Sequence, residues 1–116
     1  MPIELTDPDD AKLVTLARAT RARTGAGSGA CMRDTNGRTY AGATVALSTL
    51  RITALDVALA MAISSGATGI EAAAVLGRDD DPEADMGLDA LREFAGPGVV
   101  VYRAELDGTV TEAVRT

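Results

Sequence analysis

The chain is short of the side chains that most often bind a catalytic zinc ion. It contains no histidine and a single cysteine, Cys31, among 116 residues. Thiolate and imidazole groups bind zinc strongly and lower the pKa of its bound water. A hydrolytic zinc site of the usual histidine and cysteine type is therefore excluded, and we expect no metal and no other cofactor. With Ala30 and Met32 beside it, Cys31 is expected to be a small core residue.

Aromatic residues and positive charge are also scarce. Aromatic residues make up 3% of the sequence, and the formal net charge is −6. A negative net charge opposes broad attraction to nucleic acid or to anionic lipid. The shortage of aromatic rings removes the stacking surfaces that single-strand binders use. We therefore expect neither a nucleic acid nor a membrane as a partner.

Long apolar runs are absent as well, since no segment approaches the roughly 20 consecutive apolar residues of a membrane span. Apolar residues make up 47% and charged residues 24% of the chain, which is typical of a globular protein. The length predicts one domain over residues 1–116. The start of the sequence lacks the basic and apolar regions of a secretory signal, so a cytoplasmic location is expected.

Turn and capping signals divide the first half of the chain into a helix and a hairpin. Asp7 is suited to cap a helix with Pro8 in its first turn, and this helix should end near Arg23. The glycine-rich residues 24–29 lack the strand before and the helix after that a phosphate loop requires, so they predict a mobile loop. Asn36-Gly37 favours a tight turn with two positive φ angles, between strands at residues 30–35 and 38–45.

The second half alternates predicted helices and strands. An apolar helix is expected from Ser48 or Thr53 to Ser65, and because residues 57–63 are apolar on every face, it should be surrounded by protein. The acidic residues 79–85 lack the ligand pattern of a calcium loop and predict a solvated loop. The remaining elements are a strand at 70–76, a helix at 84–95, a strand at 99–102 and a strand or frayed end at 109–114.

This order predicts an α/β fold. Helix, hairpin, helix, strand, helix and strand follow one another, which suits one mixed sheet of four or five strands with helices packed on its faces.

Several local sequences, in the same order along the chain, resemble the cytidine deaminase family and its small relatives such as blasticidin S deaminase. Gly29-Ala30-Cys31-Met32 and Asn36-Gly37-Arg38-Thr39-Tyr40-Ala41-Gly42 resemble the first hairpin of that family. Residues 57–66 resemble its central helix and following turn, and Leu91-Arg92-Glu93-Phe94-Ala95 resembles the end of the next helix. The resemblance implies a three-layer α/β fold with a mixed sheet.

The resemblance also locates the positions where the family binds zinc, at the amino ends of two helices. The first ligand position falls on Thr53 and the catalytic glutamate position on Leu55, while a shift of one residue brings Asp56 there. The paired cysteine positions fall on Ala84 and Gly87. None of these residues matches the family's ligands, so the chain is expected to be a degenerate homologue without the zinc motif.

The nucleoside pocket implied by the resemblance is altered too. The asparagine and glutamate that hold the ribose correspond to Thr44 and Ala46. Because Thr and Asp side chains are polar, a remodelled pocket could still accept a small molecule. The residues expected to line it are Thr44, Ala46, Thr53, Asp56, Ala84 and Gly87.

These observations support one main hypothesis and leave alternatives open. The main hypothesis is a catalytically inactive homologue that acts through binding or assembly, with a homo-oligomer (dimer or tetramer) implied by the family. The first alternative is a metal-free enzyme, or a binder of a nucleoside-like small molecule, that uses the remodelled pocket. The second is a non-catalytic partner of an active deaminase.

Overall fold

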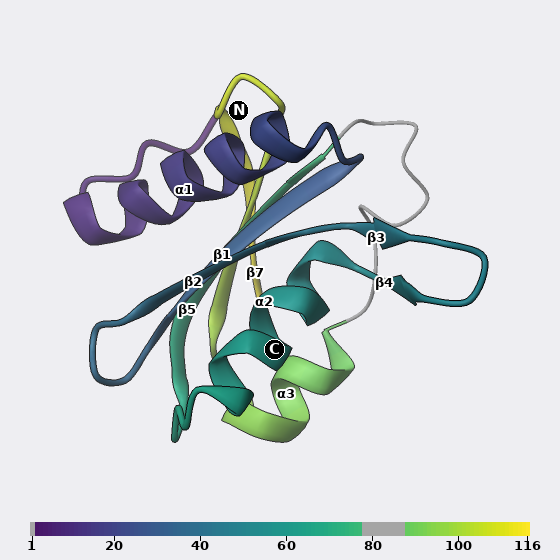
Figure 1. Cartoon of the computed structure of the whole chain (residues 1–116). Helices are drawn as coiled ribbons and strands as arrows, with labels where there is room; N and C mark the ends of the chain where they lie inside the picture. The colour runs from purple at the N-terminus through teal and green to yellow at the C-terminus, as the bar shows by residue number, and fades with distance from the viewer. Residues whose placement is uncertain (1, 78–87) are drawn as a thin grey trace.

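The computed structural model describes residues 2–77 and 88–116, and Figure 1 shows the arrangement of its elements. Helices in this part of the chain are α1 (Pro8–Thr24), α2 (Ala54–Ser64) and α3 (Asp89–Ala95). Strands are β1 (Ser28–Asp34), β2 (Thr39–Ala43), β3 (Val45–Ala46), β4 (Arg51–Ile52), β5 (Ile70–Gly77), β6 (Val100–Ala104) and β7 (Val110–Arg115). None of the helices in these ranges has the length and apolar character needed to cross a bilayer.

The main sheet is mixed, which confirms the predicted α/β fold. Within the described residues it has five strands in the order β2-β1-β5-β6-β7. Strands β5 and β6 are parallel, and the other neighbouring pairs are antiparallel. β3 and β4 form a separate two-stranded hairpin.

Helices cover both faces of this sheet, so the domain has three layers. In Figure 1, α1 crosses one face, and α2 and α3 lie together on the other. Side chains alternate along β1, since Ala30 and Met32 join the core beneath α2 and α3, whereas Cys31 joins the core beneath α1. We call these two sides the α2 face and the α1 face.

The first helix forms as the capping pattern predicts. The Asp7 carboxylate accepts a hydrogen bond from the backbone N–H of Asp9 at 2.9 Å, and Pro8 occupies the first turn. At the other end Gly25 adopts a φ of 68° and donates its N–H to the carbonyl of Arg21 at 2.9 Å. The prediction of a loop through residue 29 was wrong at its end, because Ser28 and Gly29 pair within the sheet.

Two glycines allow the helices to approach the sheet closely from opposite sides. A Cβ atom at Gly29 would lie 2.3 Å from the carbonyl oxygen of Ala17 in α1. A Cβ atom at Gly42 would lie 2.8 Å from Cγ1 of Val57 and 2.9 Å from the backbone N of Ala58 in α2. Only glycine fits at these two positions without moving a helix.

The first hairpin is confirmed, but its turn differs from the prediction. Gly37 has a positive φ of 86°, whereas Asn36 does not. The backbone N–H of Asp34 donates to the carbonyl of Arg38 at 2.8 Å, and Gly37 N–H donates to the carbonyl of Asp34 at 3.0 Å. These bonds define a three-residue loop ending in a left-handed glycine, the next most common hairpin after the two-residue type.

Helix α2 starts at the later of the two predicted positions. Thr53 is its N-cap, while β4 lies where a start at Ser48 would have placed helix. The expectation that this helix is surrounded by protein was wrong. Ala58, Leu59 and Ala62 are buried, whereas other side chains of the helix, including Met61 and Ile63, are exposed.

The remaining elements follow the predicted order. β5, β6 and β7 form at the expected places, and β7 is an edge strand paired with β6. Helix α3 begins at Asp89 within the described residues, later than the expected start at Ala84. Residues 78–87, which include the acidic stretch, lie outside the described part of the chain.

Candidate functional site

The amino end of α2 brings two of the predicted pocket residues together. Thr53 caps the helix, and its Oγ1 accepts a hydrogen bond from the backbone N–H of Asp56 at 3.1 Å. The Thr53 side chain is buried, and Asp56 is half-buried in the first turn. An acidic residue in this position stabilises the positive end of the helix dipole. Capping accounts for the presence of both residue types.

The other pocket candidates have separate environments. Thr44 Oγ1 accepts a hydrogen bond from the backbone N–H of Ser28 at 3.1 Å, and Thr44 N–H donates to the carbonyl of Ser28 at 3.1 Å. Thr44 therefore ties the end of β2 to the start of β1. Ala46 is exposed in β3. Ala84 and Gly87 lie outside the described residues.

The single thiol of the chain lies on the opposite side of the sheet from α2. Cys31 is fully buried in β1 and packs in the α1-face core with Leu13, Ala17 and Ala74. Burial raises the pKa of the Cys31 thiol to about 11, although a backbone hydrogen bond and two nearby positive charges lower it slightly. The thiol is thus protonated at neutral pH, and the thiolate form that binds metals is disfavoured.

A zinc ion at the place implied by the family does not fit the residues present. Thr53 offers a hydroxyl already engaged in capping, and Leu55 is a buried apolar side chain of the α2-face core. Across residues 2–77 and 88–116, no three histidine, cysteine, aspartate or glutamate side chains are grouped so that they could hold a metal. The chain as a whole supplies one cysteine and no histidine.

A buried carboxylate on the α2 face was not among the residues predicted from the sequence. Asp34 is 1% exposed, and its Oδ2 accepts a hydrogen bond from the hydroxyl of Tyr40 at 2.8 Å. Its Oδ1 accepts from the N–H groups of Asn36 and Arg38 at 2.9 and 3.0 Å. Burial disfavours the charged form, but these hydrogen bonds hold the pKa of Asp34 below its ordinary value. An aspartate at the first position of a type I turn is the signal that could have identified it.

A second polar network lies on the α1 face. Arg33 in β1 donates from Nη2 to Asp10 Oδ1 at 2.9 Å and from Nε to Glu71 Oε2 at 3.1 Å. The hydroxyl of Tyr102 donates to the other Asp10 oxygen at 2.7 Å. Arg33 Nη1 is buried without a hydrogen-bond partner among the described residues. Four sequence segments meet in this network, which is why no local motif reveals it.

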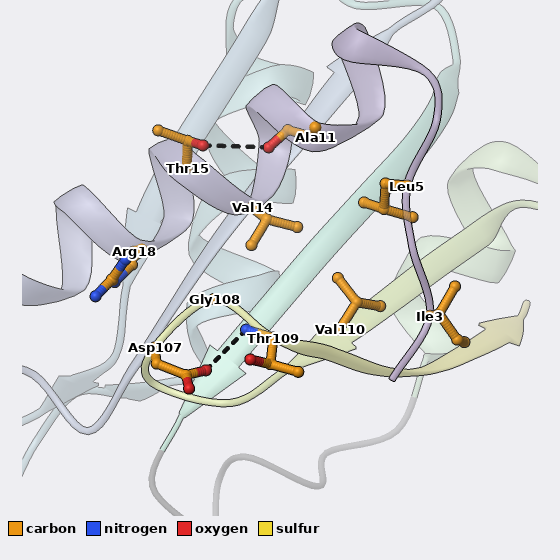
Figure 2. A pocket seen from close by; sticks show the side chains of 10 residues that line it. All are labelled: Ile3, Leu5, Ala11, Val14, Thr15, Arg18, Asp107, Gly108, Thr109 and Val110. Atoms are coloured by element: carbon orange, nitrogen blue, oxygen red, sulfur yellow. Dashed lines mark hydrogen bonds between the residues drawn. The ribbon is translucent and has the colours of Figure 1, made fainter. Parts of the chain in front are cut away.

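A cavity also opens on the α1 face, between α1, residues 3–5 and the turn before β7 (Figure 2). Its volume is about 380 Å³. None of the predicted pocket residues that the structure describes lines it. Sequence patterns could not indicate it, because its walls come from the two ends of the chain.

Comparisons with known proteins agree with this architecture. The cytidine deaminase from Burkholderia pseudomallei superposes with a TM-score of 0.76 at 24% identity, over 89% of both chains. The enzyme from Mycobacterium leprae gives 0.66 at 17% identity, over 90% of this chain and 93% of its own. The enzyme from Mycobacterium tuberculosis gives 0.66 at 20% identity, over 82% and 85% respectively. At these identities the likeness establishes the fold.

The comparison with curated proteins finds no significant match. A family model, in contrast, covers most of the sequence. The model described as cytidine deaminase-like matches residues 6–108, from the cap of α1 to the turn before β7. This match and the shared five-stranded architecture confirm the resemblance seen in the sequence, and the chain belongs to the cytidine deaminase-like family.

Proposed function

We propose that this chain is a catalytically inactive, zinc-free member of the family that acts through binding or homo-oligomeric assembly. The supporting observation is the place of its only thiol. Cys31 lies in the α1-face core, across the sheet from the amino end of α2. No rotation of this side chain brings it to Thr53, because successive residues of a strand point to opposite faces. A cytidine deaminase needs a metal-bound hydroxide and a neighbouring glutamate, and the matching positions here hold Thr53 and Leu55.

Metal content and turnover test this proposal directly. The purified chain should contain no stoichiometric zinc by elemental analysis, and it should not deaminate cytidine, deoxycytidine or blasticidin S. An active cytidine deaminase prepared in the same way provides the positive control. Stoichiometric zinc together with turnover would refute catalytic inactivity and leave the fold assignment intact.

Exposed apolar side chains support assembly. Met61 and Ile63 on α2 are 41% and 45% exposed, and Leu47 and Leu50 near the β3–β4 turn are 59% and 48% exposed. Burying such side chains against a second copy removes apolar surface from water, at about 25 cal/mol per Å². We propose that the exposed part of α2, where Met61 and Ile63 lie, is a contact between copies.

Native mass spectrometry tests the assembly. At micromolar concentration the chain should form a dimer or tetramer, and Ile63→Lys should convert it to monomer. Thr68→Lys, also exposed but polar, is the matched control and should keep the assembly. A chain that is monomeric at that concentration would reject homo-oligomerisation, while the absence of zinc and turnover would still stand.

A further inference from the structure

The cavity on the α1 face is chemically divided along its length. Figure 2 shows Arg18, Asp107 and Thr109 gathered toward one end, whereas Ile3 and Leu5 lie toward the other. The volume of about 380 Å³ falls near the lower end of the range for small-molecule sites. Its size and its division suit a compact ligand with a polar head and an apolar body.

The polar end carries one charge of each sign. Asp107 Oδ1 accepts a hydrogen bond from the backbone N–H of Thr109 at 2.8 Å. Hydrogen bonds from the side chain and the backbone N–H of Thr109, together with the nearby positive charge of Arg18, hold the pKa of Asp107 below its ordinary value, so its carboxylate is ionised at neutral pH. Within the described ranges, the Arg18 guanidinium has neither a hydrogen-bond nor an ion-pair partner. Both groups are exposed and lie against the same cavity.

The apolar end is held by the sheet and by α1. Val14 is 6% exposed and Val110 is 5% exposed, and both belong to the α1-face core. Residue 3 is tied to β7 through a hydrogen bond from the N–H of Ile3 to the carbonyl of Val110 at 2.7 Å. The aliphatic wall is therefore built before any ligand arrives, which reduces the entropy lost on binding.

We propose that this cavity binds an aliphatic α-amino acid in its zwitterionic form. The ligand carboxylate pairs with the Arg18 guanidinium, its ammonium group pairs with the Asp107 carboxylate, and its side chain packs against Val14 and Val110. A simple carboxylate would meet the negative charge of Asp107, and a simple amine would meet the positive charge of Arg18. A zwitterion satisfies both groups, and the net charge of −6 does not repel it. This site is separate from the α2 end of the domain and does not depend on the proposed inactivity.

A titration of the full-length, isotope-labelled chain by NMR tests the proposal, with L-leucine as the probe. Saturable shifts should appear at the backbone amides of Arg18, Thr109 and Val110, with a dissociation constant of about 1 mM or lower. 4-Methylpentanoate lacks the ammonium group, 3-methylbutylamine lacks the carboxylate, and glycine lacks the side chain. Each should bind roughly tenfold more weakly or worse, because each leaves one part of the cavity unmatched.

Variants link the binding to the named groups. Arg18→Gln should weaken leucine binding about tenfold or more, because it removes the charged partner of the carboxylate. Arg23→Gln, an exposed arginine on the same helix away from the cavity, is the matched control and should bind like the parent chain. Ala11→Leu should also abolish binding, because its larger side chain fills the cavity. Far-UV circular dichroism confirms that each variant is folded.

Three outcomes would overturn the proposal. The first is the absence of saturable shifts at about 10 mM leucine, which is weaker than a built site should allow. The second is equal binding of leucine and 4-methylpentanoate, which would remove the role of Asp107. The third is a set of shifts centred on Thr53 and Asp56, which would place the ligand at the amino end of α2.

Discussion

Both faces of the central sheet carry a tyrosine–aspartate pair, but the two faces differ in how far that pair is enclosed. Each face carries a tyrosine hydroxyl that donates to an aspartate, Tyr40 to Asp34 on the α2 face at 2.8 Å and Tyr102 to Asp10 on the α1 face at 2.7 Å. On the α2 face the pair is enclosed, since Asp34 is 1% exposed. On the α1 face Asp10 is 15% exposed and also pairs with Arg33.

This contrast separates a closed face from an open one. The α2 face combines apolar packing with the enclosed carboxylate of Asp34, and its core residues come from α2, α3 and the sheet. The α1 face combines a smaller apolar core with an ionic network and a cavity. Polar groups near solvent keep part of their hydration, so the loss of one partner costs less there than in an enclosed site.

The close approach of helices to glycines gives the largest expected effect. Gly29→Ala should lower the free energy of unfolding by about 3 kcal/mol, because its Cβ would lie 2.3 Å from a backbone oxygen of α1. Gly42→Ala should cost about 2 kcal/mol, since its nearest contact, in α2, is 2.8 Å away. Urea denaturation measures both.

A third glycine separates crowding from backbone strain. Gly66 has a φ of 93° with nothing within 4 Å of an added Cβ, so Gly66→Ala should cost about 1 kcal/mol from conformation alone. An equal loss for Gly29→Ala and Gly66→Ala would contradict a steric role for Gly29.

The tyrosine pair tests the contrast between enclosed and open faces. Tyr40→Phe should lower the urea midpoint roughly twice as much as Tyr102→Phe, because Asp34 loses the side-chain donor Tyr40 while Asp10 keeps Arg33. Both variants keep the ring and its packing. Equal urea midpoints for the two variants would show that the enclosure of the aspartate does not determine how much stability is lost.

The helix caps extend the comparison to the two main helices. Thr53→Ala should cost about 1 kcal/mol, because the buried Oγ1 caps α2 through the N–H of Asp56. Asp7→Ala should cost about half of that, because Asp7 is exposed and water replaces the lost acceptor. Thr53→Ser keeps the hydroxyl and serves as the control. A larger loss at Asp7 than at Thr53 would reverse this ranking.

Acid titration gives the smallest effect. The pKa of Asp34 is lower in the folded chain than its ordinary value of 3.8, so the folded state favours the ionised form. Its contribution to stability is therefore complete above that value and disappears as the pH falls through the lowered pKa. Asp34→Asn should flatten the fall of unfolding free energy below pH 3.8 relative to the parent chain. Asp89→Asn, which alters an exposed carboxylate, should leave it unchanged.

Local sequence signals predicted most elements because their causes are local. The Asp7 cap, the turn at residues 36–37 and the glycines after helices each act within a few residues, so the order of helices and strands could be inferred. The errors arose where contacts with surrounding residues determine the local conformation or the exposure of an element. The turn has one positive φ angle because the Asp34 carboxylate accepts from two of its N–H groups, and α2 is exposed on one side because the sheet covers only the other.

The candidate site was predicted less completely than the fold. Thr53 and Asp56 were among the predicted pocket residues, and a capping hydrogen bond joins them in the structure. Thr44 is bound to β1 and Ala46 is exposed, so the polar pocket expected from all these residues stays a prediction. Asp34, Arg33 and the cavity were missed, because each depends on segments distant in the sequence that meet only in the folded chain.

The amino-acid sequence by itself determined which of the usual zinc ligands this chain can offer, one cysteine and no histidine, since donor atoms absent from the composition cannot be supplied by folding. The tertiary structure alone decided where the remaining groups lie. It turned Cys31 toward α1, enclosed Asp34 beneath Tyr40, and brought Arg18 and Asp107 to one cavity. The physical reason is that composition limits which chemistry is possible, whereas strand alternation and helix packing determine which groups meet.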